Sequence, residues 1–557
     1  MTGSAYARYV RGVVPPDNLD DAIELLNATT TVVVKQEVEL TESKREIAML
    51  RQQLALMRQG IFGRRSEKLH PNQIRAFEAA AEEAGTDDEY ETIEIPAGKV
   101  KKKIKGHGKG RFSAHLPRED HRAELAEADR LCPCCGKLMV EFGADISERG
   151  RIIPPKVIVC RYHQAKYACP DGHGVKSAPL PENVVDGGKY DATVYAHIAT
   201  LKYSDHLPLN RISVILKRYG IDMAKSTMSD LLARMDELVA QPIIKQMRAE
   251  LLEHRELQAD ETPFTTRIEG EKTTKTGFIY TWQSIRLCEE PKILIDFRMD
   301  RSRTGPRAFL ANWTGVLLTD GYAGYNEVAV ANDIERAGCW AHGRRKFADA
   351  LKIGSKAATR VLRPIHRLFW IERAILKRAA GDEASGKGPM NAEELLALRE
   401  RVRAKRSTQV LELIYKEADA LEAFRSTLPK SALGKAIGYL KNQAGPLRKF
   451  LDWPSLPIHN NDAERTLRHC VVGRKNYLFF GSPRGGEMAA RLYSLVLSCR
   501  ANDVNPEAYI VDVLTKISTT PFSEIASLTP WGWKAAQAKL VAADEVVQPP
   551  LIGAPGA

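Results

Sequence analysis

Apolar residues recur every seven positions near the N-terminus. They stand at Leu26, Val33, Leu40, Ile47, Leu54 and Ile61. A seven-residue repeat keeps one apolar stripe against a partner helix, as in a coiled coil. The second apolar position of each heptad is polar until Leu50 and Met57, so the repeat is well formed only over about 39–59. The pattern predicts a helix that assembles the chain into a homo-oligomer, with a lone amphipathic helix packed on its own domain as the alternative.

Helical periodicity returns over residues 185–250. A helix over 211–219, a turn at Gly220 and a second helix from Thr227 have the outline of a helix-turn-helix, which ordinary helical hairpins share. The Ser226 hydroxyl is placed to cap the second helix. Lys225, beside that cap, is therefore a candidate DNA-binding residue.

From about residue 255 the pattern changes to short β-rich segments. The expected order is strand, strand, strand, helix, strand, helix, strand, and a mainly helical stretch follows over 343–455. Both aspartates are expected at strand ends: Asp260 ends the first strand after Leu257-Gln258-Ala259, and Asp320 ends the fourth, after Val316–Thr319. A mixed sheet in which these two strands are neighbours would bring both aspartates together. The order of elements and acids therefore predicts a ribonuclease-H-like α/β core.

A third acid, Glu464, lies in the expected first turn of a helix after the helical stretch. Three carboxylates can hold two divalent ions about 3.5–4 Å apart, which clamp the attacking and leaving oxygens of a phosphoryl transfer. Mg²⁺ prefers oxygen ligands, and Mn²⁺ accepts the same set. Asp462 is a rival to Glu464, and Glu261 is a competing carboxylate beside Asp260. The residue pattern alone leaves these alternatives open.

Charge favours a polyanionic partner such as DNA. The chain of 557 residues has a formal net charge of +12 and a pI of about 9.1. An acidic segment at 82–94 precedes a basic one at 99–111, which is either an arm on DNA phosphates or a solvated linker. Bases also gather next to Glu464 and after Cys339-Trp340-Ala341-His342. The candidate phosphate contacts are Lys101, Lys102, Lys103, Arg344, Arg345, Lys346, Arg465, Arg468, Arg474 and Lys475.

Five of the nine cysteines lie between Cys132 and Cys169. This clustering indicates a metal site in a reducing cytoplasm, not a disulfide framework. Cys132, Cys135, Cys169 and His173 are the predicted ligands of a closed, structural Zn²⁺ site. Cys134, Cys160 and His163 are possible substitutes. The chain contains no apolar run of 18 residues, so no membrane span is expected.

Together these motifs resemble the large subunit of bacterial DDE transposases of the insertion sequence sixty-six family. The resemblance runs from about Leu40 to Lys534. It includes Phe62–Leu69, Ala114–Glu119, Cys132–Gly136, Lys202–Leu209, Ala259–Pro263, Thr319–Tyr322, Cys339–His342, Asn460–Arg465, Gly473–Asn476, Asn505–Tyr509 and Pro530–Trp533.

The resemblance implies that Glu464, not Asp462, is the third catalytic acid. It also implies a zinc-finger-like module before the catalytic core, and accessory proteins encoded by the same element. One departure is that Gly172 stands where the family has the last cysteine of a second Cys-x-x-Cys pair. His173 then has to complete the site, and otherwise zinc binding is weakened or lost.

We therefore expect a multidomain α+β DNA transposase in the bacterial cytoplasm, associated with the nucleoid. It would bind the terminal inverted repeats of its element, cleave there, and join the freed 3′-hydroxyl to target DNA. The alternatives are a DNA-binding regulator without catalysis and a nuclease that cuts without joining. The expected regions are a coiled-coil helix (17–75), a charged linker (76–113), the zinc module (114–182), a helical DNA-binding region (183–250), the first part of the catalytic core (251–352), a helical insertion (353–454), the second part of the core (455–500) and a C-terminal segment (501–557).

Overall fold

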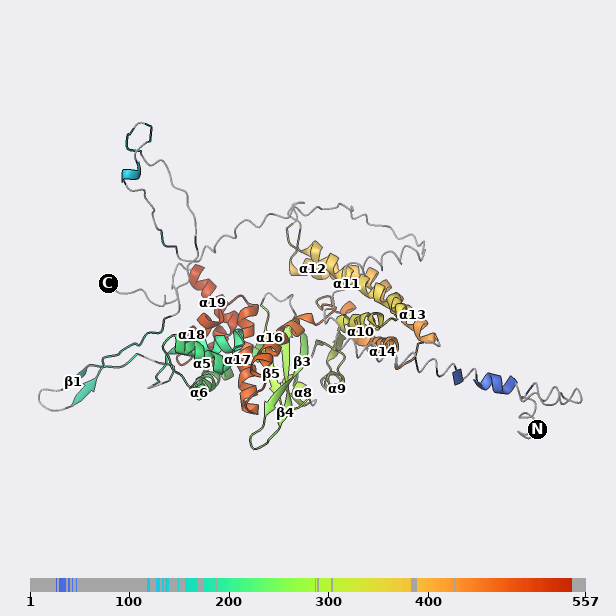
Figure 1. Ribbon diagram of the computed structural model, residues 1–557, viewed down its shortest axis with the longest axis horizontal. Coiled ribbons are helices and arrows are strands. Elements are labelled where there is room, and N and C mark those ends of the chain that lie inside the picture. Colours follow the sequence, from blue (N-terminus) through green and yellow to red (C-terminus); the bar gives the residue numbers. More distant parts are fainter. Residues whose placement is uncertain are drawn as a thin grey trace, which may run out of the picture. The chain divides into compact units, whose positions relative to one another are not determined.

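A computed structural model (Figure 1) describes residues 30–36, 118–120, 127–130, 136–139, 156–168 and 174–181, a few single positions near them, and 183–542 apart from 186–187, 286, 288–289, 302–303, 382–387 and 425–426. The chain divides into two units, one of residues 1–67 and 162–557, the other of 68–161. The elements described below belong to the first unit. The four predicted zinc ligands, Lys101, Lys102, Lys103 and most of the heptad repeat lie outside the described residues; residues 30–36 are helical.

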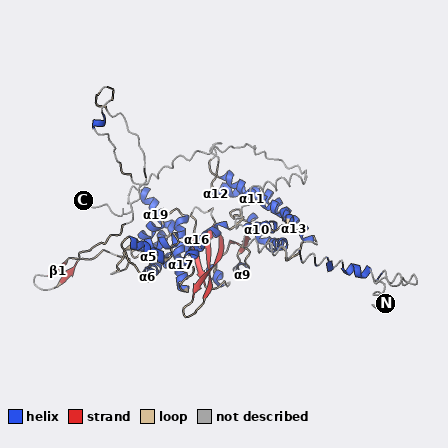
Figure 2. Cartoon of the chain, in the orientation of Figure 1, coloured by secondary structure: helices blue, strands red, loops and turns tan. Residues whose placement is uncertain are grey.

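A five-stranded mixed sheet, red in Figure 2, lies at the centre of this unit, in the order β5-β4-β3-β6-β7. β3 pairs antiparallel with β4, and β4 antiparallel with β5, whereas β6 pairs parallel with both β3 and β7. The order of strands and helices along the chain agrees with the sequence prediction. The elements are β3 (Glu256–Arg267), β4 (Thr274–Ser284), β5 (Ile293–Arg298), α8 (Thr304–Phe309), β6 (Val316–Thr319), α9 (Ala323–Asn332) and β7 (Glu335–Gly338).

The two faces of the sheet belong to two different cores, because side chains alternate along a strand. Leu317 of β6 belongs to one hydrophobic cluster, and its neighbours Val316 and Leu318 belong to the other. The first face packs against α17 (Pro483–Ala501) through β5. The second face of the sheet lies against helices formed by the part of the chain between Asp320 and Glu464.

The helices of the second face begin with α10 (Trp340–Lys352). They continue with α11 (Thr359–Ala379), α12 (Ala392–Val402), α13 (Thr408–Ala423), α14 (Ala432–Asn442) and α15 (Ala444–Arg448). The Trp340 indole N–H donates to the Leu447 carbonyl at 2.9 Å, and α14 packs on α10. The stretch of more than a hundred residues between Asp320 and Glu464 therefore folds back onto the sheet.

A fully buried arginine, Arg403, organises these helices. It binds both carboxylate oxygens of Glu372 at 2.8 Å. Its remaining N–H groups donate to the carbonyls of Phe450, Trp453, Pro454 and Leu456. A buried charge is tolerated only when it is paired and hydrogen-bonded in this way.

Helices α4 (Ala192–Ala199), α5 (Leu209–Arg218), α6 (Lys225–Met235) and α7 (Gln241–Leu251) precede the sheet and share the first core with α17. Gly220 has a φ of +92°, in the left-handed region that favours glycine at a turn. The prediction that Ser226 caps the second helix is wrong. The helix begins at Lys225, the capping position is Ala224, and Ser226 is already its second residue.

The remaining helices complete the first core. α16 (Asn461–Tyr477) packs on β3 and β4, and α18 (Pro506–Lys516) packs on α4. Asp236 and Arg491 of α17 form a bidentate ion pair at 2.7 Å, which fixes the N-terminal helices on α17. α19 (Pro530–Ala542) follows. Among the described helices, none is long and apolar enough to cross a membrane.

Candidate active site

Asp260 and Asp320 lie on adjacent strands at the same level of the sheet. The parallel pairing of β3 with β6 matches Glu256 with Val316 and Gln258 with Leu318. Extending this register by two residues places Asp260 beside Asp320, and neighbouring strands are about 4.8 Å apart. Asp320 directly follows β6, and its Oδ1 accepts a hydrogen bond from the Tyr322 N–H at 2.9 Å.

The prediction that Asp260 ends its strand is wrong. β3 continues to Arg267 because β4 pairs with it over Leu257–Arg267. The shorter β6 ends at Thr319, just before the level of Asp260. Asp260 therefore lies at the level where β3 loses its neighbour β6.

Burial, and after it the negative charges of Glu261, Asp320 and Glu464, raise the pKa of the Asp260 carboxyl to about 8. The Glu261 N–H donates to Asp260 Oδ1 at 3.0 Å and partly opposes these effects. A carboxyl that is removed from water and surrounded by like charges is one that a bound cation would stabilise in its ionised form.

Glu464, and not Asp462, acts electrostatically on Asp260. Its charge is among those that raise the pKa of Asp260, and its carboxylate lies 3.9 Å from His342 Nε2 and 3.7 Å from Arg345 Nη2. Asp462 pairs with Arg465 at 2.8 Å along its own helix. Because Asp462 and Glu464 are two residues apart on a helix, their side chains point in different directions. This geometry separates two acids that the residue pattern left equivalent.

Asn460 ties the start of α16 to the sheet. Asn460 occupies the capping position of this helix, but its side chain makes no capping hydrogen bond. It is fully buried, its side-chain N–H donates to the Ala259 carbonyl at 3.4 Å, and its backbone N–H donates to Cys339 Sγ at 3.5 Å. It therefore positions Glu464 relative to Asp260, a role that the sequence pattern did not indicate.

Cys339 and His342 lie beside Glu464 at the start of α10. Their sulfur and ring nitrogen and a Glu464 oxygen all lie within 4.8 Å of one another, close enough to hold one metal ion. Burial raises the pKa of Cys339 to about 11 and lowers the pKa of His342. In the sequence, these two residues stood out only as the segment that precedes the bases of α10.

Glu261, the competing carboxylate, is fully engaged elsewhere. One oxygen accepts from Arg301 Nη2 at 2.6 Å, and the other accepts from the Tyr325 hydroxyl at 2.7 Å. Its side chain is only 3% exposed. Glu261 therefore holds the surroundings of Asp260 together, and both of its oxygens already accept a hydrogen bond.

Helices from the part of the chain between Asp320 and Glu464 contact the site directly. A Cβ on Gly321, the residue after Asp320, would lie 2.7 Å from the ring of Tyr439 on α14. The Lys346 ammonium lies 4.9 Å from the centre of that ring, and the Arg344 guanidinium lies 4.6 Å from the centre of the Phe369 ring. These cation–π contacts fix the two bases of α10 between the site and the helices.

The other basic candidates lie on α16, the helix that carries Glu464. Arg465 is exposed and paired with Asp462, and Arg474 donates to the Pro263 carbonyl and to Thr262 Oγ1. Arg468 and Lys475 are exposed on the same helix. Lys225 is exposed at the first turn of α6, distant in sequence from this group.

Comparison with known families covers most of the chain. The model for "Transposase IS66 family" matches residues 187–488, and the model for the "IS66 C-terminal element" matches 494–531. The "zinc-finger binding domain of transposase IS66" matches 129–171, and "Transposase C of IS166 homeodomain" matches 49–120. The zinc-finger match includes Cys132, Cys135 and Cys169, which supports a structural Zn²⁺.

Relatives of similar length are found in Sinorhizobium fredii (strain NBRC 101917 / NGR234). The uncharacterized protein y4qI is 30% identical over 564 residues, which is 94% of this chain and 99% of that protein. The uncharacterized protein y4jD is 30% identical over 445 residues, which is 77% of this chain and 82% of that protein.

The domains matched, together with a mixed sheet bearing clustered carboxylates beside basic helices, define a transposase with DNA-binding regions. The chain belongs to the IS66 transposase family. The resemblance found in the sequence is thereby confirmed.

Proposed function

We propose that this transposase cleaves DNA at the ends of its element and joins them to target DNA, with Asp260, Asp320 and Glu464 as its catalytic acids. The observation that carries the proposal is the strand register that places the two aspartates side by side, with Glu464 within electrostatic reach. Phosphoryl transfer to a water and then to a 3′-hydroxyl requires the same in-line geometry, so one site serves both steps.

The donor set fits Mg²⁺ or Mn²⁺. All three side chains offer carboxylate oxygens, and one oxygen of Glu464 is buried without a hydrogen-bond partner among the described residues. When bound, two such ions supply the positive charge that stabilises the attacking and leaving oxygens of the phosphodiester. Asn460 and the Glu261–Arg301–Tyr325 contacts hold the acids in place.

We assign the sheet and α16 to a ribonuclease-H-like core, made of residues 251–352 and 455–500 and interrupted by a helical insertion over 353–454. The support is the strand order β5-β4-β3-β6-β7, with three antiparallel strands followed by two parallel ones, and the position of the acids on its central strands. The contact of Tyr439 with Gly321 supports an insertion that helps to shape the site.

The basic residues around the site suit a DNA backbone. Arg344, Arg345 and Lys346 on α10 and Arg465, Arg468, Arg474 and Lys475 on α16 flank the acids and would contact phosphates. Lys225 on α6 and the basic segment of Lys101, Lys102 and Lys103 would bind DNA further away. Assembly through the N-terminal helix, His173 as the fourth zinc ligand, and cooperation with other proteins of the element remain proposals from the sequence.

A strand-transfer assay tests the proposed function. The full chain is incubated with Mg²⁺, target DNA and a radiolabelled duplex of the element's terminal repeat whose 3′-hydroxyl is already exposed. We expect joined products, and we expect Asp320→Ala to abolish them while end binding persists. Cleavage of uncut ends without joining of pre-cut ends would instead identify a nuclease, and binding without either reaction would identify a regulator.

The raised pKa of Asp260 predicts proton release on metal binding. With a pKa of about 8, this carboxyl is mostly protonated at pH 7 and must ionise to bind a metal. Mn²⁺ affinity should therefore rise up to about tenfold per pH unit below pH 8 and level off above it. The pKa of His342 is lowered, so its ring contributes little to this change.

Titration calorimetry in two buffers of different ionisation enthalpy, at pH 7, measures the released protons. We expect release close to one proton per chain in the wild type and in Asp462→Asn. An affinity for Mn²⁺ that does not change between pH 6 and pH 8 would contradict this prediction.

A further inference from the structure

A strained turn follows α16 and exposes two apolar side chains. Leu478 has φ +68° and ψ −48°, and the Phe479 N–H donates to the Tyr477 carbonyl at 2.7 Å, which closes a three-residue turn. This conformation is rare for a residue with a side chain, and strain of this kind gathers at ligand-binding positions. Leu478 is 65% exposed and Phe479 is 43% exposed.

The next residue fixes the turn on the sheet. The Phe480 N–H donates to the Thr265 carbonyl at 3.0 Å, and the Arg267 N–H donates to the Phe480 carbonyl at 2.9 Å. The buried Phe480 ring stacks on Phe264 with 3.9 Å between ring centres. The exposed side chains of Leu478 and Phe479 are thus presented from a rigid base.

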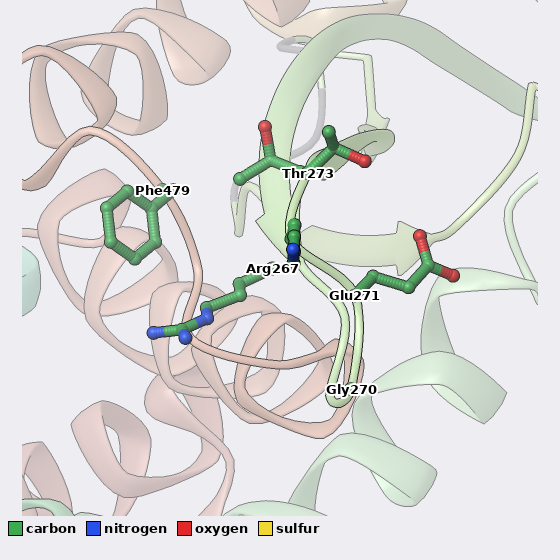
Figure 3. Close-up of a pocket in the computed structure, with 7 residues that line it drawn as sticks. Arg267, Gly270, Glu271, Thr273 and Phe479 are labelled. Atoms are coloured by element: carbon green, nitrogen blue, oxygen red, sulfur yellow. The ribbon is translucent and has the colours of Figure 1, made fainter.

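Phe479 forms one wall of a hollow of about 500 Å³ between this turn and the β3–β4 hairpin, here called the hairpin hollow (Figure 3). Arg267, Lys272 and Thr273 also line it. Figure 3 shows the Arg267 guanidinium on the same side of the hairpin as the Phe479 ring, with Glu271 directed away from both.

The hairpin hollow carries net positive charge. Its one acid, Glu271, pairs with Lys275 at 2.6 Å, and in the described part of the chain no carboxylate pairs with Arg267 or Lys272. An exposed aromatic face, two cations and the Thr273 hydroxyl are the groups that hold a nucleotide. The base stacks on the ring, and the cations and the hydroxyl bind its phosphate.

Two of the three elements that carry the proposed catalytic acids, β3 and α16, also lead to this hollow. Along β3, Arg267 lies about 23 Å from Asp260 at 3.3 Å per residue, and along α16, Leu478 lies about 21 Å from Glu464 at 1.5 Å per residue. At 3.4 Å per nucleotide, this corresponds to about six or seven nucleotides of DNA. A strand lying in the active site is long enough to reach the hollow.

We propose that the hairpin hollow binds one unpaired base of the DNA on which the transposase acts, stacked on Phe479. Leu478 fills the gap that the base leaves in the duplex, as apolar wedges do when they unstack base steps. Arg267 and Lys272 bind the phosphate of the displaced nucleotide. This inference rests on the proposed function, because that function places DNA in the active site.

Fluorescence of 2-aminopurine tests the inference. The full chain, carrying Asp260→Asn and with no divalent ion added, is titrated with a duplex that contains one unpaired 2-aminopurine and with a fully paired duplex of the same sequence. We expect tighter binding and quenching with the unpaired base. Phe479→Ala should weaken binding of that duplex about 5- to 100-fold and leave the paired duplex unchanged.

Three further variants separate stacking from misfolding. Phe479→Trp should keep the preference for the unpaired base. Leu478→Gly should reduce quenching without lowering the melting temperature, because glycine accepts a positive φ. Phe522→Ala removes an aromatic ring that is 70% exposed elsewhere and should change nothing.

The inference is overturned if Phe479→Ala keeps the preference for the unpaired base, or if it weakens both duplexes equally. It is also overturned if Phe479→Ala instead dissociates an oligomer in sedimentation, because the turn would then be a contact between copies. Since the assay involves no catalysis, these outcomes do not depend on whether the strand-transfer assay succeeds.

Discussion

Replacing Glu464 by Gln is expected to lower metal-dependent strand transfer by about 10³-fold or more, since a carboxylate that holds a catalytic ion acts mainly on the transition state. The negative charge of this acid acts on Asp260, and one of its oxygens is buried without a hydrogen-bond partner among the described residues. Binding of the element's end should persist, because the basic residues of α10 and α16 are unchanged. Joined product is measured on a gel with pre-cut ends.

Asp462→Asn is the matched control for that prediction. Asp462 lies on the same helix turn but pairs with the exposed Arg465, and ion pairs of this kind contribute little, so transfer should stay within about fivefold of the wild type. The reverse pattern, with an active Glu464→Gln protein and an inactive Asp462→Asn protein, would show that the acid has been assigned wrongly.

Arg403→Met is expected to destabilise the helical insertion by about 3–5 kcal/mol, because it leaves the buried Glu372 without its bidentate partner. Loosened helices would also release the Tyr439 contact beside Asp320, so strand transfer should fall with stability. Urea unfolding followed by tryptophan fluorescence measures the change in free energy.

Two variants serve as controls for Arg403→Met. Arg401 is exposed on the same helix, and Arg401→Met should alter stability by no more than about 0.5 kcal/mol. The double variant Arg403→Met with Glu372→Met removes both charges of the pair but leaves the buried Arg399, 3.9 Å from Glu372, without its acid, so it should recover only part of the loss. Equal stability of the Arg403 and Arg401 variants would refute the role given to this ion pair.

The order of strands and helices could be read from the sequence, because several strands of the sheet contain a short apolar segment that follows or precedes turn residues. Ile293–Arg298 and Val316–Thr319 are examples. The ends of elements were less predictable. The polar stretch of β3 beyond Asp260 reads as a loop, yet β4 pairs with it as far as Arg267.

The prediction that Ser226 caps α6 was wrong for a related reason. Serine is a good capping residue wherever a helix begins, but here the helix begins one residue before Ser226, with Ala224 at the cap. Side-chain preference indicates that a helix starts nearby, whereas packing of buried residues such as Met228 decides the register.

The choice among neighbouring acids depended on contacts that are distant in sequence. Nothing local distinguishes Glu261 from Asp260, but Arg301 and Tyr325 occupy both oxygens of Glu261. In the same way, Asn460 contacts Ala259, some two hundred residues earlier in the chain. Such partners are known only once the strands and α16 are placed in space.

The most direct test of the proposed metal-binding acids is strand transfer by Asp320→Cys in Mg²⁺ and in Mn²⁺. A thiolate suits softer metals better than Mg²⁺, so the variant should lose about 10³-fold activity in Mg²⁺ and recover at least about tenfold in Mn²⁺. Asp320→Ala has no ligand at this position and should recover in neither metal. Equal behaviour of the Cys and Ala variants in both metals would contradict the account, because Asp320 would then not bind a metal ion.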